Sequence, residues 1–266
     1  MLDLLDLLLL RRGIPADDRT LTFRRIDGAV QSNVIYFLPW HTPYGFARQA
    51  GFAPLEFLAA YEMPPAIVSS EPELSVRAMR ALVQDAERLL DEHNVAAREA
   101  LIVGLSVGTY PAIYLANRIG ARLCAVAPAD RADLMTWQSP AARLVKRRAI
   151  QKGYRLSHYA RAMAGCHPAQ NLGGVAPDSV FVIGRRDPFV PARRRAALLD
   201  AIERHLPSSQ VVMPDAGHFA TLIAGGRHQL AMLGLAPPRW WRMPRPLEWT
   251  LPWRGARRRP AELTPR

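Results

Sequence analysis

The sequence predicts an α/β protein in which a mostly parallel sheet is flanked by helices. Short runs of apolar and β-branched residues alternate along the chain with longer segments of helical period. No internal repeat or low-complexity stretch interrupts this alternation before residue 237. The chain has 266 residues, of which 49% are hydrophobic and 22% charged, and this is enough for one sizeable core. Alternating strands and helices are typical of parallel sheets with helical crossovers.

Seven short segments are expected to form strands, because each is rich in apolar, β-branched or aromatic residues and ends near a proline, a glycine or a polar residue. Only one of them precedes the strongly apolar segment 34–38, so the sheet is expected to have reduced N-terminal strands and fewer than eight strands in all. The expected strands cover residues 20–26, 34–38, 66–70, 100–103, 123–127, 179–183 and 210–213.

Segments of helical period separate these strands. Helices are expected over residues 72–93, 109–119 and 191–205, and again after residue 218. Residues 129–172 are long, basic and helical without any strand signal, and we interpret them as an inserted helical lid. Cations on this insert would attract an anionic substrate or surface, or would simply form a solvated helix face. They are Arg131, Arg143, Lys146, Arg147, Arg148, Lys152, Arg155 and Arg161.

The N-terminal residues 1–12 are apolar but do not have the pattern of a secretory signal. Asp3 and Asp6 interrupt the apolar run, and Arg11 and Arg12 follow it instead of preceding it. Acids at the start and arginines at the end suit the dipole of a short helix. We expect this helix to pack on the core, with peripheral contact to an anionic membrane as the alternative.

The last thirty residues form a tail of different composition. Residues 237–266 contain eight arginines against two glutamates, so half of the net charge of +12 lies there, together with four of the six tryptophans. The prolines and the lack of any period argue against a packed core. We therefore expect one domain over residues 1–236 and a tail that is not an independent domain. Mixed tryptophan and arginine suit an anionic membrane interface, and also packing over the parent domain.

The charge and the cysteines bear on partners and compartment. Lys146 and Lys152 are the only lysines, so the positive charge reflects an arginine-rich composition and we expect no nucleic-acid partner. Cys124 and Cys166 do not have the spacing of a disulfide framework or a zinc site. A reducing, cytoplasmic compartment is therefore expected.

Ser106 is the candidate nucleophile. It lies in the segment Gly104-Leu105-Ser106-Val107-Gly108, between an apolar strand and a helical pattern. A serine hydroxyl needs a neighbouring base, and it must be held clear of the sheet so that a substrate carbonyl can reach it. A sharp strand-to-helix turn achieves this, and small residues two before and two after the serine give the backbone room.

His218 and Asp187 are the candidate base and orienting acid. Among seven histidines, only His218 follows a predicted strand on a loop, directly after a glycine. Asp187 follows the preceding strand, 31 residues earlier, so both loops are expected at one edge of the sheet. Asp130 is the runner-up for the acid and Asp215 a weaker candidate, while Asp187 would otherwise only begin a turn before Pro188.

These three motifs together resemble the α/β-hydrolase superfamily, over about residues 20–235. The order serine, aspartate, histidine along the chain is the order of that family. The resemblance implies an α/β-hydrolase fold and hydrolysis of a carboxylic ester or thioester of small-molecule size through an acyl-enzyme on Ser106, with no metal or organic cofactor.

The family also implies an oxyanion hole, with one donor from the backbone N–H of Val107. The second donor comes from the loop after an early strand, which here contains Trp40 and His41 in place of the usual His-Gly. Both remain candidates. Two other functions remain open, namely acyl transfer through the same three residues and non-catalytic ligand binding.

Overall fold

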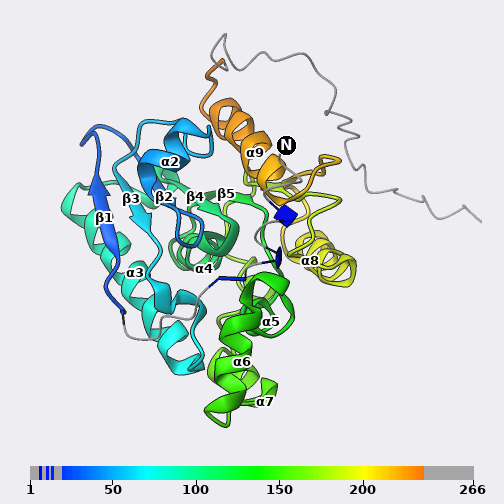
Figure 1. The fold of residues 1–266 in the computed structure, drawn as a ribbon. Coiled ribbons are helices and arrows are strands. Elements are labelled where there is room, and N and C mark those ends of the chain that lie inside the picture. The colour runs from blue at the N-terminus through cyan, green and yellow to red at the C-terminus, as the bar shows by residue number, and fades with distance from the viewer. Residues whose placement is uncertain (1–5, 8–9, 12, 15–19, 237–266) are drawn as a thin grey trace, which may run out of the picture.

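The structure is a computed structural model that describes residues 6–7, 10–11, 13–14 and 20–236. Within these residues a central sheet has helices on both faces (Figure 1). The predicted tail lies outside the described residues, and so does most of the predicted N-terminal helix. The four described residues of that helix, Asp6, Leu7, Leu10 and Arg11, are helical.

The sheet has seven strands in the order β1-β3-β2-β4-β5-β6-β7 among the described residues. The pair β1–β3 is antiparallel, and every other neighbouring pair is parallel. The mostly parallel sheet with fewer than eight strands is therefore confirmed. The strands are β1 Arg24–Asp27, β2 Val34–Phe37, β3 Ala59–Glu62, β4 Leu101–Leu105, β5 Arg122–Val126, β6 Val180–Val182 and β7 Gln210–Val212.

Two predictions about the early strands were wrong. The segment 66–70 is not a strand, because Pro65–Val68 forms the 3-10 helix η1. Pro64 and Pro65 fix the backbone there and donate no N–H, which suits the first turn of a helix better than a sheet. The strand is instead Ala59–Glu62, whose alanines have little strand propensity of their own. The first strand also begins later than predicted, at Arg24.

Alternation along the strands divides the core into two layers. In β2, Ile35 and Phe37 face one layer, and Val34 and Tyr36 face the other. The first layer contains α3 Pro72–Glu92, α4 Thr109–Ile119 and α8 Ala192–His205, and the second contains α2 Tyr44–Gln49 and α9 His218–Met232. Figure 1 shows α3 and α4 on one side of the sheet and α2 and α9 on the other.

Residues 129–172 are helical, as predicted, and connect β5 to β6. They extend from the body of the molecule as a separate group of helices (Figure 1). Their elements are α5 Ala132–Gln138, η4 Pro140–Ala142, α6 Arg143–Gln151, α7 Leu156–Ala162 and η5 Pro168–Gln170. One further 3-10 turn, η2 Ala97–Glu99, precedes β4.

Among the described residues, no helix has both the length and the hydropathy that spanning a membrane requires.

Candidate active site

Ser106 lies in a strained turn between β4 and α4. It opens the short 3-10 turn η3 Ser106–Gly108, and its φ of 54° lies in the left-handed region that side chains rarely adopt. A Cβ on Gly104 would lie 2.6 Å from Ala112 Cβ, and one on Gly108 would lie 2.2 Å from the carbonyl oxygen of Phe37. Both glycines are therefore required by the close approach of this turn to α4 and β2.

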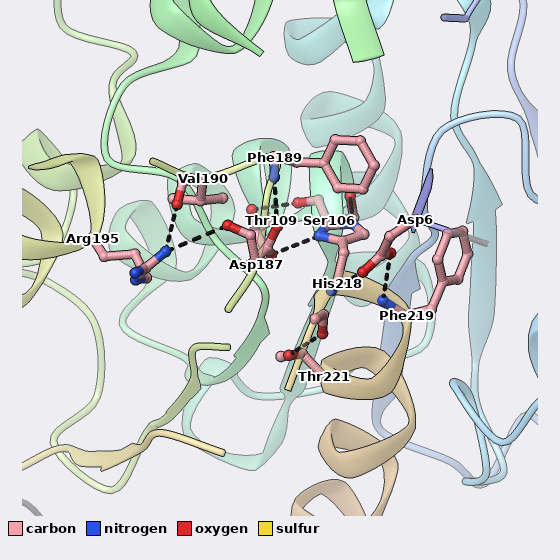
Figure 2. A network of polar contacts seen from close by, with 11 residues as sticks. Asp6, Ser106, Thr109, Asp187, Phe189, Val190, Arg195, His218, Phe219 and Thr221 are labelled. Carbon is pink, nitrogen blue, oxygen red and sulfur yellow. Dashed lines mark hydrogen bonds and ion pairs between the residues drawn. The ribbon is translucent and has the colours of Figure 1, made fainter. Parts of the chain in front are cut away.

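The three predicted residues form one hydrogen-bonded chain. His218 Nε2 lies 2.8 Å from Ser106 Oγ, and His218 Nδ1 lies 2.7 Å from Asp187 Oδ2 (Figure 2). Ser106 follows β4, Asp187 follows β6 and His218 follows β7, so the carboxyl ends of parallel strands bring them to one edge of the sheet.

The Asp187 loop holds the carboxylate in place from its other side. The backbone N–H of Phe189 donates to Asp187 Oδ1 at 2.8 Å. The Phe189 ring meets the His218 imidazole edge-on, with centroids 4.8 Å apart. Asp187 is only 3% exposed. One oxygen of Asp187 is thus fixed by its own loop while the other faces the imidazole.

The pKa of His218 is raised above the usual value of an imidazole. Burial has the largest individual effect and lowers this pKa, but the charge of Asp187, its hydrogen bond and the charge of Asp6 together outweigh burial. These carboxylates stabilise the imidazolium form. The arrangement favours proton uptake from Ser106, which is what a general base must do.

The alternative acids do not reach the imidazole. Asp130 pairs with Arg194 at 3.1 Å. Asp215 is exposed and pairs with Arg186 at 3.0 Å. Only Asp187, of the three aspartates considered, contacts a ring nitrogen of His218.

The loop after β2 makes a tight turn beside Ser106. The N–H of Thr42 donates to the carbonyl of Pro39 at 3.2 Å, so the turn's own hydrogen bond uses neither the N–H of Trp40 nor that of His41. Trp40 borders the cavity next to Ser106, whereas His41 is exposed and does not border it. Val107 borders the same cavity.

A cavity of about 120 Å³ opens in front of Ser106 and His218. Its lining includes no Asp, Glu, Lys or Arg among the described residues. Met135 and Ala142 of the insert form part of the wall, and Phe189, Phe219 and Leu222 also line it. The insert therefore borders the site with its apolar side chains.

Several charges of the insert are occupied by contacts within the protein. Arg131 pairs with Asp133 at 2.5 Å and Lys152 with Glu71 at 2.6 Å. Lys146 lies 5.4 Å from the centre of the Trp137 ring. These three cations have partners inside the protein, so they offer less to an anionic substrate than the sequence suggests.

Neither cysteine is placed to act as a nucleophile. Burial raises the pKa of Cys124 to about 12 and also raises that of Cys166, so both thiols are protonated at neutral pH. Within the described ranges, no three or more His, Cys, Asp or Glu side chains are grouped so as to hold a metal ion.

Solved structures decide which fold this is. An α/β-hydrolase enzyme from a Medee basin deep-sea metagenome library aligns with a TM-score of 0.52 at 15% identity, over 82% of this chain and 95% of that one. This chain has the α/β-hydrolase fold. An S-formylglutathione hydrolase from Agrobacterium tumefaciens shares the fold at a TM-score of 0.55 and 13% identity, over 80% of this chain and 88% of that one.

A capsule O-acetyltransferase of Neisseria meningitidis serogroup A also shares the α/β-hydrolase fold. Its TM-score is 0.52 at 12% identity, over 79% of this chain and 89% of that one. No protein-family model matches the sequence, and no curated protein matches it.

Sequence reasoning missed the contribution of the N-terminal residues to the site of this α/β-hydrolase fold. Asp6 accepts the backbone N–H of His218 at 2.8 Å, and Ile14 lines the cavity. The sequence pattern indicates only that Asp6 suits the dipole of a short helix, and it assigns no role to Ile14. The interruption of an apolar run by an aspartate was the one available signal, because a carboxylate among leucines needs buried partners if the segment packs on the core.

Proposed function

We propose that this protein is a serine hydrolase that cleaves a carboxylic ester or thioester through an acyl-enzyme on Ser106. The observation that carries the proposal is the hydrogen-bonded chain from Ser106 through His218 to Asp187, with distances of 2.8 and 2.7 Å. Its position in front of an apolar cavity supports the same conclusion.

The reaction begins with transfer of the Ser106 hydroxyl proton to His218 Nε2 as Oγ bonds to the substrate carbonyl carbon. The carbonyl oxygen becomes an oxyanion, for which the backbone N–H groups of Val107 and Trp40 are the proposed donors. The imidazolium then gives its proton to the leaving alcohol or thiol as the tetrahedral intermediate collapses. This step leaves an acyl ester on Ser106.

Water completes the cycle. His218 takes a proton from a water molecule, whose oxygen attacks the acyl carbon. The Ser106 oxygen leaves and regains its proton from His218, and a carboxylic acid is released. Asp187 stays ionised throughout and stabilises the imidazolium in both steps.

The cavity favours a small, uncharged acyl group. Its volume of about 120 Å³ is of the same order as the roughly 150 Å³ apolar cavity known to hold benzene. A lining without charged side chains among the described residues would leave a buried charge on the acyl group without a partner. We therefore propose short apolar acyl groups, with the leaving group outside this cavity.

Labelling with a fluorophosphonate, combined with turnover of a short-chain aryl ester, tests the proposal. Wild type is expected to be labelled at Ser106, and Ser106→Ala is expected to lose labelling and about four to six orders of magnitude in kcat. Ser70→Ala serves as a control for loss of a buried serine hydroxyl. Equal labelling of the wild type and Ser106→Ala would falsify the proposal.

Acyl transfer is the second candidate, favoured by the apolar cavity wall and by the fold shared with an O-acetyltransferase. An alcohol would then replace water in the second half of the reaction. Product analysis in graded concentrations of a small alcohol separates the two, since a transferase forms mainly the new ester while water is in large excess.

A membrane-surface role for the C-terminal tail is a separate proposal. Sedimentation with anionic liposomes compares the full chain with one that ends at Ala236. Equal sedimentation of the two proteins would contradict a membrane contact through the tail.

A further inference from the structure

The described residues of the N-terminal segment, 6–7, 10–11 and 13–14, reach the candidate active site from the far end of the sequence. Asp6 precedes His218 by 212 residues, yet its Oδ2 accepts the His218 backbone N–H at 2.8 Å. Its Oδ1 accepts the N–H of Phe219 at 3.3 Å. Figure 2 shows the Asp6 carboxylate facing these two residues. Asp6 is only 4% exposed, so this contact is a buried one.

The two N–H groups that Asp6 accepts are the first two of α9. The first N–H groups of a helix have no acceptor within the helix, and a side chain at the preceding position usually supplies one. Here Gly217 occupies that position and has no side chain. Asp6 therefore caps α9 from a distant part of the chain, with a negative charge where the helix dipole favours one.

His218 is itself the first residue of α9, and this gives the cap a consequence for the imidazole. Fixing the backbone of His218 fixes the origin of the side chain that bridges Ser106 and Asp187. A small displacement of the His218 backbone would disturb the hydrogen bonds of its ring with Ser106 and Asp187. Misplacement by about 1 Å is enough to cost an enzyme up to a hundredfold in rate.

The same segment is anchored at its other end to the helical insert. The N–H of Ile14 donates to the carbonyl of Ala141 at 2.8 Å. The Arg143 guanidinium donates to the carbonyls of Leu10 and Arg11. The described residues of this segment therefore contact both α9, which carries His218, and the insert, which borders the cavity.

We propose that Asp6 is a positioning residue for His218, which it holds by the backbone N–H while placing a second carboxylate near the imidazole. This inference rests on the proposed function in that it takes the imidazole as the general base. Asp6 touches neither Ser106 Oγ nor the cavity, so it acts through His218 alone.

Among the described residues, few charges surround His218, so the effect of the Asp6 carboxylate on the pKa of His218 can be measured. The carboxylates that influence its imidazole are Asp187 and Asp6, and no charged side chain of the described residues lines the cavity in front of it. Burial is the largest effect on Asp6 and raises its pKa, while its hydrogen bonds with the His218 and Phe219 backbone and the charge of His218 oppose that rise. Because the negative charge of Asp6 raises the pKa of His218, replacing Asp6 by a neutral residue should lower that pKa.

The experiment measures the His218 pKa by NMR titration of its imidazole, together with kcat and KM, in the full chain. Asp6→Asn retains an oxygen that can accept the His218 N–H but removes the charge. Asp6→Ala removes both. Asp215→Asn is the matched control, because it removes an exposed carboxylate three residues before His218 that does not contact the imidazole.

We expect the His218 pKa to fall in both Asp6 variants and to stay at the wild-type value in Asp215→Asn. The kcat of Asp6→Ala should fall about ten- to a hundredfold with little change in KM, and Asp6→Asn should retain most of kcat. Because neutral His218 is the active base, the acidic limb of kcat/KM should move to lower pH in Asp6→Asn.

An unchanged His218 pKa in Asp6→Asn would overturn the proposal, as would wild-type kcat in Asp6→Ala. A loss of kcat without any change in that pKa would leave Asp6 a merely structural role and would also overturn it. Asp6→Asn keeps the test decisive if Asp6→Ala does not fold. The titration needs no turnover, so absence of Ser106-dependent activity in the wild type would sink the proposed function and leave the Asp6–His218 coupling to be judged by NMR.

Discussion

The Ser106 turn and the N-terminal segment 6–14 both hold parts of one site, but they do so by opposite means. The Ser106 turn is local, since the glycines that it needs lie two residues before and two after the serine. The N-terminal segment depends on contacts across 212 residues of sequence and on two partners that are themselves far apart in the chain. The residues that the Ser106 turn needs are therefore close to it in sequence, although one of them, Gly108, packs on Phe37 of β2, whereas the surroundings of His218 come from distant parts of the chain.

A first prediction tests whether Asp187 or another carboxylate supports His218. Asp187→Asn should lower kcat about 10⁴-fold, because the amide cannot stabilise the imidazolium and favours the wrong tautomer of His218. That loss corresponds to about 5 kcal/mol of transition-state stabilisation. Steady-state kinetics with a short-chain ester measures it. Asp130→Asn is the control, since Asp130 is as buried as Asp187 but pairs with Arg194. Equal losses in the two variants would mean that burial, not contact with His218, matters.

A second prediction tests the crowding of the Ser106 turn against β2. Gly108→Ala should reduce the free energy of unfolding by about 3 kcal/mol, the upper part of the range for an overpacked site, because its Cβ would lie 2.2 Å from a backbone oxygen. Denaturant unfolding measures the change. Gly173→Ala is the matched control, since its Cβ would meet nothing within 4 Å. A Gly108→Ala protein as stable as Gly173→Ala would contradict the close approach to Phe37.

A third prediction concerns the N-terminal contribution to the cavity lining. Ile14→Ala should enlarge the cavity from the side of the N-terminal segment, since Ile14 lines it. Its kcat/KM ratio for a longer over a shorter acyl chain should rise about tenfold, as one methylene in an apolar pocket is worth roughly 1–3 kcal/mol. An ester series graded by chain length measures this. Val30→Ala, an exposed aliphatic residue away from the cavity, is the control. An unchanged kcat/KM ratio in Ile14→Ala would show that Ile14 does not influence the choice of acyl chain length.

The strands show where sequence reasoning succeeds and where it fails. The segment 34–38 was predictable because its residues are apolar and β-branched or aromatic, as a strand buried on both faces requires. Ala59–Glu62 was not predictable from propensity, because its strand conformation depends on pairing with β1 on one side and β2 on the other. The segment 66–70 shows the opposite error, because apolar residues alone predict a strand where the preceding prolines favour a 3-10 helix.

The sequence alone predicts a mostly parallel α/β sheet of fewer than eight strands and the loops that carry Ser106, Asp187 and His218. Those features depend on local periodicity and on glycines close to the serine, which a linear chain displays directly. Other features become visible only in the folded chain, namely that Asp6 caps the helix of His218, that Ile14 borders the cavity and that Trp40 rather than His41 borders it. These contacts join residues far apart in the chain or depend on the direction of a turn, and no local pattern encodes either.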